Sequence, residues 1–80
     1  MLTVRYFAGA RAAANGVSTE SAEAGSLEEL TQQLIDRHGE RLGPVLKAAS
    51  FLVDGLNCRD RRAPLPAGAT VDVLPPFAGG

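Results

Sequence analysis

The stretch S-L-E-E-L-T-Q-Q-L-I-D-R-H-G, residues 26–39, decides the fold of this chain. Ser26 and Glu29 have the Ser-x-x-Glu spacing of a capping box, in which both side chains satisfy free backbone N–H groups at a helix start. Apolar residues then recur at helical spacing: Leu27, Leu30, Leu34 and Ile35. Gly39 follows where a left-handed residue commonly ends a helix. The stretch therefore predicts a helix over Leu27–His38 with one face that another layer must cover.

The residues before this helix predict two strands in a loose hairpin. Residues 2–8 alternate in polarity, which places three side chains on one face: Leu2, Val4 and Tyr6. Residues 10–14 are rich in alanine and fit a single helical turn. Asn15-Gly16 is a strong turn signal, because both residues tolerate positive φ. Residues 17–22 alternate weakly and are expected to form the second strand.

The residues after the helix begin with a connection, 40–50, that fits a short helix. We expect Pro44 at its first position, where a missing N–H does no harm. Three side chains are then expected to face the core: Val45, Leu46 and Ala49.

A second hairpin and a final strand complete the predicted sheet. The apolar run 51–53 enters a turn at Asp54-Gly55. Residues 59–68 form a loop, and Thr70–Leu74 is the last strand, with its valines inward and Asp72 outward. If the first and last strands are adjacent and parallel, the connection between them is long enough to contain the helix. We predict an α+β fold, a ubiquitin-like β-grasp with a mixed sheet of four to five strands packed on one main helix.

The end of the chain, Leu74-Pro75-Pro76-Phe77-Ala78-Gly79-Gly80, is the candidate functional segment. Two prolines cannot donate ladder hydrogen bonds, so they end the strand and direct the tail away from it. Glycine lacks a Cβ and therefore permits an extended thread to enter a narrow channel. Six residue steps reach roughly 20 Å at about 3.3–3.6 Å per residue. We predict a β-grasp domain over residues 1–74 and a flexible tail over residues 75–80 whose reactive group is the α-carboxylate of Gly80.

Composition excludes several other functions. The net charge is −1 and no basic run resembles a nucleic-acid footprint. No apolar stretch is long enough to span a membrane, and no signal-peptide pattern precedes the domain, so the cytoplasm is the expected location. His38 lacks neighbours at metal-ligand spacing and is expected to lie at the negative end of its helix, and Cys58 is expected to fill space. No metal site is predicted.

Three segments of the sequence resemble the MoaD/ThiS family of sulfur carriers. They are Val4-Arg5-Tyr6-Phe7-Ala8 with Arg11, the 51–55 hairpin, and above all the tail. The resemblance covers essentially the whole chain, and within the family it is strongest to the small subunit of molybdopterin synthase, which the Pro-Pro pair favours.

The resemblance implies a function in molybdenum cofactor biosynthesis. A ubiquitin-activating-type (MoeB-type) enzyme would adenylate Gly80 with ATP and Mg²⁺, and a sulfur donor enzyme would convert the acyl-adenylate to a thiocarboxylate. The tail, through Pro75, Pro76, Phe77, Ala78 and Gly79, would then enter the large subunit of molybdopterin synthase (MoaE-type) and give sulfur to cyclic pyranopterin monophosphate. The chain would bind no cofactor itself, and the catalytic side chains of this sulfurtransferase would lie on the large subunit.

Other functions stay open at this point. The same tail would serve a sulfur carrier for thiamine or cysteine biosynthesis. It would also serve a ubiquitin-like modifier that attaches Gly80 to a lysine of a target. A passive β-grasp binding module is a further alternative.

Overall fold

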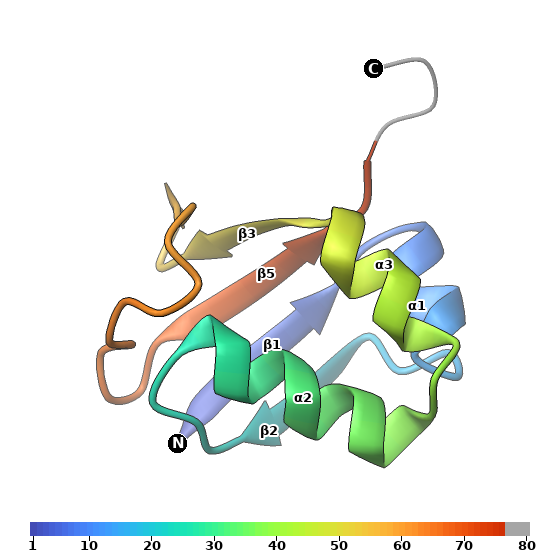
Figure 1. Ribbon diagram of the computed structural model, residues 1–80, viewed down its shortest axis with the longest axis horizontal. Helices are drawn as coiled ribbons and strands as arrows, with labels where there is room; N and C mark the ends of the chain where they lie inside the picture. Colours follow the sequence, from blue (N-terminus) through green and yellow to red (C-terminus); the bar gives the residue numbers. More distant parts are fainter. Residues whose placement is uncertain (77–80) are drawn as a thin grey trace.

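A computed structural model describes residues 1–76 of the chain. Its elements in chain order are β1 (Leu2–Tyr6), α1 (Gly9–Ala13), β2 (Thr19–Ala22), α2 (Leu27–His38), α3 (Leu42–Ala48), β3 (Ser50–Val53), β4 (Leu56–Asn57) and β5 (Thr70–Leu74). The strands form one five-stranded sheet in the order β2-β1-β5-β3-β4. Helices α2 and α3 cover one face of this sheet (Figure 1). This is the predicted ubiquitin-like β-grasp.

The two central strands come from opposite ends of the chain. β1 and β5 are parallel, with Val4 opposite Val71, while β2 and β3 flank them antiparallel. A parallel pair needs a long crossover connection, and α2 lies within it as predicted. The strand that leads into the tail is therefore held by hydrogen-bonded neighbours on both sides.

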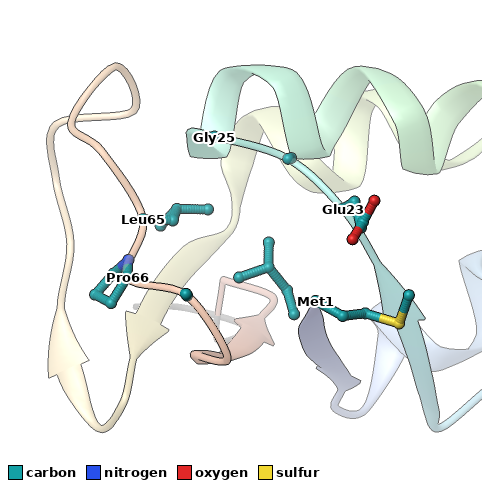
Figure 2. A pocket seen from close by; sticks show the side chains of 8 residues that line it. Met1, Glu23, Gly25, Leu65 and Pro66 are labelled. Atoms are coloured by element: carbon teal, nitrogen blue, oxygen red, sulfur yellow. The ribbon is translucent and has the colours of Figure 1, made fainter.

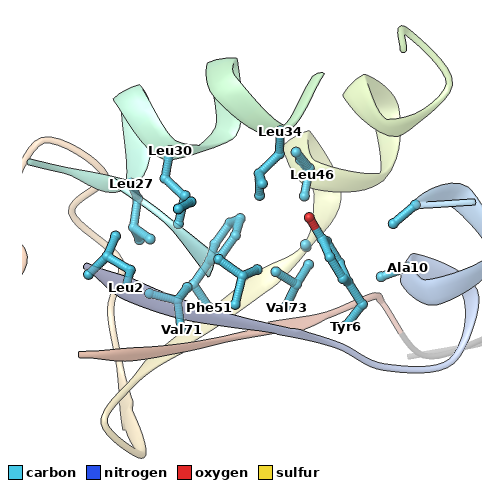
Figure 3. Close-up of a cluster of buried hydrophobic side chains, with 14 of the residues drawn as sticks. Leu2, Tyr6, Ala10, Leu27, Leu30, Leu34, Leu46, Phe51, Val71 and Val73 are labelled. Carbon is cyan, nitrogen blue, oxygen red and sulfur yellow. The ribbon is translucent and has the colours of Figure 1, made fainter. Parts of the chain in front are cut away.

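The core lies between the sheet and the helices, as Figure 3 shows from the side. Helix α2 begins after Ser26, whose Oγ accepts a hydrogen bond from the Glu29 N–H at 3.3 Å. Its buried side chains are the predicted leucines at 27, 30 and 34. They meet the inward side chains of the strands and the buried residues of α3: Leu2, Val4, Tyr6, Phe51, Val71, Val73, Leu42 and Leu46.

The short helix α3 begins earlier than the sequence predicted. Pro44 is its third residue rather than its first. The sequence signal was ambiguous because the first turn of a helix has no internal acceptors for its N–H groups, so proline is tolerated anywhere within it. Because the helix begins earlier, its buried residues include Leu42, which is fully buried. The predicted core residues Leu46 and Ala49 are also buried.

The two predicted turns have the positive φ angles that their residues favour. Asn15 and Gly16 have φ of 61° and 82°, and Asp54 and Gly55 have φ of 51° and 85°. The second turn is also fixed to the last strand. The Asp54 N–H donates to the Thr70 carbonyl at 2.8 Å, and the Thr70 N–H donates to Asp54 Oδ1 at 2.9 Å. The hairpin is thereby held against the start of β5.

Candidate functional site

The candidate site is the edge of the sheet where β5 ends and the tail begins. Val71, Asp72 and Val73 are all buried, so β5 is a rigid support for the tail. Leu74 pairs with Ser50 in β3, and on the other side the Phe7 N–H donates to the Val73 carbonyl at 3.2 Å. The ladder extends to the last residue before the prolines.

Two prolines directly follow β5. Pro75 is half-buried beside the sheet edge and Pro76 is exposed. Neither has an N–H with which to continue the ladder. The remaining predicted site residues, Phe77, Ala78, Gly79 and Gly80, lie outside the described residues.

An ion pair on the open face of the sheet lies next to this edge. Arg5 in β1 binds Asp72 in β5 through two hydrogen bonds, Nε to Oδ1 at 2.5 Å and Nη2 to Oδ2 at 2.8 Å. The Arg5 guanidinium also lies 5.6 Å from the ring centroid of Phe7. Asp72 points away from the core, as alternation predicts, yet only 6% of it is exposed. The sequence predicted that Asp72 faces outward but did not predict its burial, because Arg5, which covers it, lies near the other end of the chain.

A polar cluster lies on the covered face of the sheet. Glu20 of β2 accepts hydrogen bonds from the Tyr6 hydroxyl at 2.6 Å and Arg37 Nη1 at 2.7 Å, and its Oε2 lies 2.5 Å from His38 Nε2. Burial disfavours the charged carboxylate, but these hydrogen bonds together outweigh it, so the pKa of Glu20 lies below its ordinary value. Burial, and then the bond to Glu20, raises the pKa of Tyr6.

This cluster has the character of a structural connection. Each polar group is paired within it, and no buried side-chain N or O atom of residues 1–76 lacks a partner. His38 therefore has an acidic partner that the sequence analysis did not identify. No local sequence pattern indicated this pair, because Glu20 lies 18 residues before His38 and strand pairing brings the two residues together.

Within residues 1–76, no group of three His, Cys, Asp or Glu side chains converges on a common point that could hold a metal ion. Cys58 is half-buried and its thiol donates to the Asp60 carbonyl at 3.4 Å. No helix in this part of the chain is long and apolar enough to cross a membrane.

One cavity of the domain lies far from the end of β5. It has a volume of about 450 Å³ and lies between the segment leading into α2 and the loop that carries Leu65 and Pro66, with Met1 across from that loop (Figure 2). β1 begins there, and the parallel β5 carries the tail to the opposite end of the sheet. The cavity is therefore not part of the candidate site.

Comparison with known proteins identifies the family. The model of the ThiS family matches residues 4–80. The chain belongs to the ThiS family. ThiS/MoaD proteins are ubiquitin-like sulfur carriers. The chain therefore belongs to a family of sulfur carriers, as its sequence indicated. The match includes the Gly-Gly end that lies beyond the described residues. No curated protein sequence matches the chain.

Several solved structures share the fold. Small archaeal modifier protein 1 (SAMP1) from Methanosarcina acetivorans has a TM-score of 0.85 at 22% identity, over 99% of this chain and 95% of that one. A chain of the BexX/CysO complex from Amycolatopsis orientalis has a TM-score of 0.82 at 19% identity, over 100% of both. A chain of the complex of subunits 1 and 2 of molybdopterin-converting factor from Helicobacter pylori 26695 has a TM-score of 0.71 at 23% identity, over 99% and 97%. At these identities the likeness shows the fold alone.

Proposed function

We propose that this ThiS-family protein carries sulfur as a thiocarboxylate on Gly80 and delivers it in molybdenum cofactor biosynthesis. One observation carries the proposal: β5, which is hydrogen-bonded to β1 and β3, ends at Leu74, and Pro75-Pro76 and a Gly-Gly end follow it directly in the sequence. A strand held on both sides, followed by a short segment that ends in two glycines, suits presentation of the terminal carboxylate to a partner's active site.

The chemistry requires activation by a partner. The Gly80 carboxylate attacks the α-phosphate of ATP, which releases pyrophosphate and leaves an acyl-adenylate. Hydrosulfide delivered by the donor enzyme then attacks the carbonyl carbon, and AMP departs, which leaves the thiocarboxylate. The thiocarboxylate sulfur attacks a carbon of cyclic pyranopterin monophosphate and displaces an oxygen leaving group, which gives a thioester. Water hydrolyses this thioester, so the sulfur stays on the pterin and the Gly80 carboxylate is regenerated. We assign the acid–base groups for these steps to side chains of the partners.

The partners follow from this sequence of steps. We propose an adenylating enzyme of the ubiquitin-activating type, a sulfur donor enzyme and the large subunit of molybdopterin synthase, all in the cytoplasm. The ATP and Mg²⁺ would be bound by the adenylating enzyme. The complex of subunits 1 and 2 of molybdopterin-converting factor, with a chain similar to this one, supports a partner subunit.

Two experiments test the proposal. ATP–pyrophosphate exchange by the adenylating enzyme from the same cells should require Gly80, because the carboxylate must reach the α-phosphate. Deletion of Gly80 should abolish exchange while the melting temperature stays the same, and equal exchange by the deletion variant refutes the assignment. Transfer of sulfur from the thiocarboxylated chain to cyclic pyranopterin monophosphate, in the presence of the large subunit, then tests the pathway. The Gly80 deletion variant is its control.

A second candidate is a protein modifier. The likeness to small archaeal modifier protein 1 favours it, since that structure has a TM-score of 0.85. In this function a target lysine would attack the activated Gly80 carbonyl to form an isopeptide bond. The same adenylation precedes both functions, so the acceptor distinguishes them.

A further inference from the structure

A second cavity lies one strand away from the end of β5, where the tail begins. It has a volume of about 250 Å³, and six residues around it carry the argument: Ser50, Phe51, Asn57, Cys58, Arg59 and Arg61. Ser50 is the register partner of Leu74, the last residue before Pro75. Neighbouring strands lie about 4.8 Å apart, so the cavity borders the candidate site. We call it the Arg59–Arg61 cavity.

Two arginines give this cavity a positive charge that the domain does not neutralise. Within residues 1–76, no carboxylate lies within 4 Å of either guanidinium. In the same part of the chain, the exposed side chain of Arg59 donates no hydrogen bond. Its neighbour Asp60 instead accepts from the Arg62 N–H at 3.0 Å. The charge of Arg59 is thus available to a ligand.

Arg61 is held in position by its own domain. Its guanidinium lies 4.8 Å from the ring centroid of Phe51, and its Nη2 donates to the carbonyls of Lys47 and Ala49 at 3.1 and 3.3 Å. These contacts fix the plane of the guanidinium at the cavity wall. A fixed guanidinium loses less side-chain entropy on binding than a free one.

The donors around the cavity suit a carboxylate. Guanidinium groups present paired N–H donors that match the two oxygens of a carboxylate, and Asn57 and Ser50 add an amide and a hydroxyl. A tail of a few residues buries too little area for a stable complex, so a protein that binds it must also contact the surface around the exit. The Arg59–Arg61 cavity lies on that surface.

We propose that the Arg59–Arg61 cavity receives an aspartate or glutamate side chain of the adenylating enzyme. This rests on the proposed function, in which that enzyme takes the tail into its active site. The contact would orient the domain while the tail is threaded, and it would select partners with an acidic side chain at this point. The contact would strengthen association between the chain and the adenylating enzyme. It would leave the adenylation chemistry at Gly80 unchanged.

The test measures KM and kcat for the chain in ATP–pyrophosphate exchange by the adenylating enzyme from the same cells. Arg59→Glu places like charges together, so KM should rise about tenfold or more while kcat is unchanged. Arg59→Lys keeps the charge but loses the paired N–H donors, so its KM should lie between those of wild type and Arg59→Glu. Arg62→Glu is the matched control. Arg62 is exposed and lies outside the cavity, and its replacement by glutamate changes the net charge by the same amount as Arg59→Glu. All variants should melt at the wild-type temperature.

Salt and substitution together separate the possible outcomes. Added salt should raise the wild-type KM and change the KM of Arg59→Glu much less, because screening weakens an exposed charge contact. Equal KM values for wild type, Arg59→Glu and Arg62→Glu, with exchange still dependent on Gly80, would overturn the cavity proposal alone. An equal rise in KM for Arg59→Glu and Arg62→Glu would also overturn it, since net charge would then be the cause. No exchange with the wild-type chain would overturn the proposed function and this contact with it.

Discussion

The Nε2 atom of His38, the last residue of α2, lies 2.5 Å from Oε2 of Glu20 in β2. Glu20 is also bound by Tyr6 of β1 and Arg37 of α2, so one carboxylate connects three elements. Only 13% of its side chain is exposed, and 8% of the His38 side chain. This connection fixes the end of the main helix to the edge strand of the sheet.

The Glu20 contacts make the stability of the domain sensitive to acid. Because the pKa of Glu20 is lowered in the folded state, its contribution is complete above the ordinary value of 4.5 and is lost as pH falls through the lower, folded-state pKa. Glu20→Gln should lower the free energy of unfolding at pH 7 by about 1–3 kcal/mol and flatten its decline in acid. Urea titrations at a series of pH values measure both effects. Glu23→Gln is the control, because Glu23 is a nearby exposed residue. If the free energy of unfolding falls equally steeply in acid for wild type and Glu20→Gln, the assignment is contradicted.

Leu34 should carry a large part of the stability. Its side chain is fully buried between α2 and the sheet, so Leu34→Ala should lower the free energy of unfolding by about 2–5 kcal/mol. Gln32→Ala, on the exposed face of the same helix, should change it by about 0.5 kcal/mol or less. Thermal unfolding of the two variants tests the prediction. An unchanged melting temperature for Leu34→Ala would show that another face of α2 packs on the sheet.

Gly55 should resist substitution for reasons of backbone geometry alone. It has φ of 85°, and a Cβ added there would meet no atom within 4 Å. Gly55→Ala should therefore cost about 1–2 kcal/mol, the penalty for a left-handed alanine. Gly9, at the start of α1, lacks positive φ and also has open space around it, so Gly9→Ala should be neutral or stabilising. If Gly55→Ala proves as stable as Gly9→Ala, the hairpin turn has a different conformation.

Phe77 is predicted to bind a partner. It comes directly after two prolines, which favours its exposure to a partner's surface, and buried aromatic residues at interface centres commonly contribute about 2 kcal/mol or more. Phe77→Ala should weaken binding to the large subunit of molybdopterin synthase about thirtyfold, with little change in melting temperature. Calorimetric titration of this variant and of a truncation after Pro76 measures the effect. Wild-type affinity in both would show that the tail does not contribute to binding, and unfolding of Phe77→Ala would place it in the core.

Local sequence patterns predicted the elements of the fold well. The helix Leu27–His38 and the strand Thr70–Leu74 have the predicted bounds, because a capping box, a leucine stripe and flanking turn residues all lie within a few positions of each other. The sequence analysis named parallel pairing of the first and last strands only as a condition of the fold, and the structure shows that pairing between β1 and β5.

Local sequence patterns did not predict the contacts between distant segments of the chain. The Glu20–His38 contact and the burial of Asp72 under Arg5 depend on which residues the sheet register places together. The cavity beside the tail exit is a similar case, because Ser50 and Arg59 become neighbours only when the second hairpin folds. The sequence indicated the tail as the functional segment and shows a basic run at 59–62, but no local pattern placed that run beside the end of β5.

The central claim is that Gly80 carries sulfur, and intact-protein mass spectrometry of the chain isolated from its own cells tests it most directly. The account predicts a fraction whose mass is greater by the replacement of one oxygen with sulfur, with the change located by fragmentation at Gly80. A chain found only with an unchanged carboxylate, or only joined through Gly80 to lysines of other proteins, would contradict it.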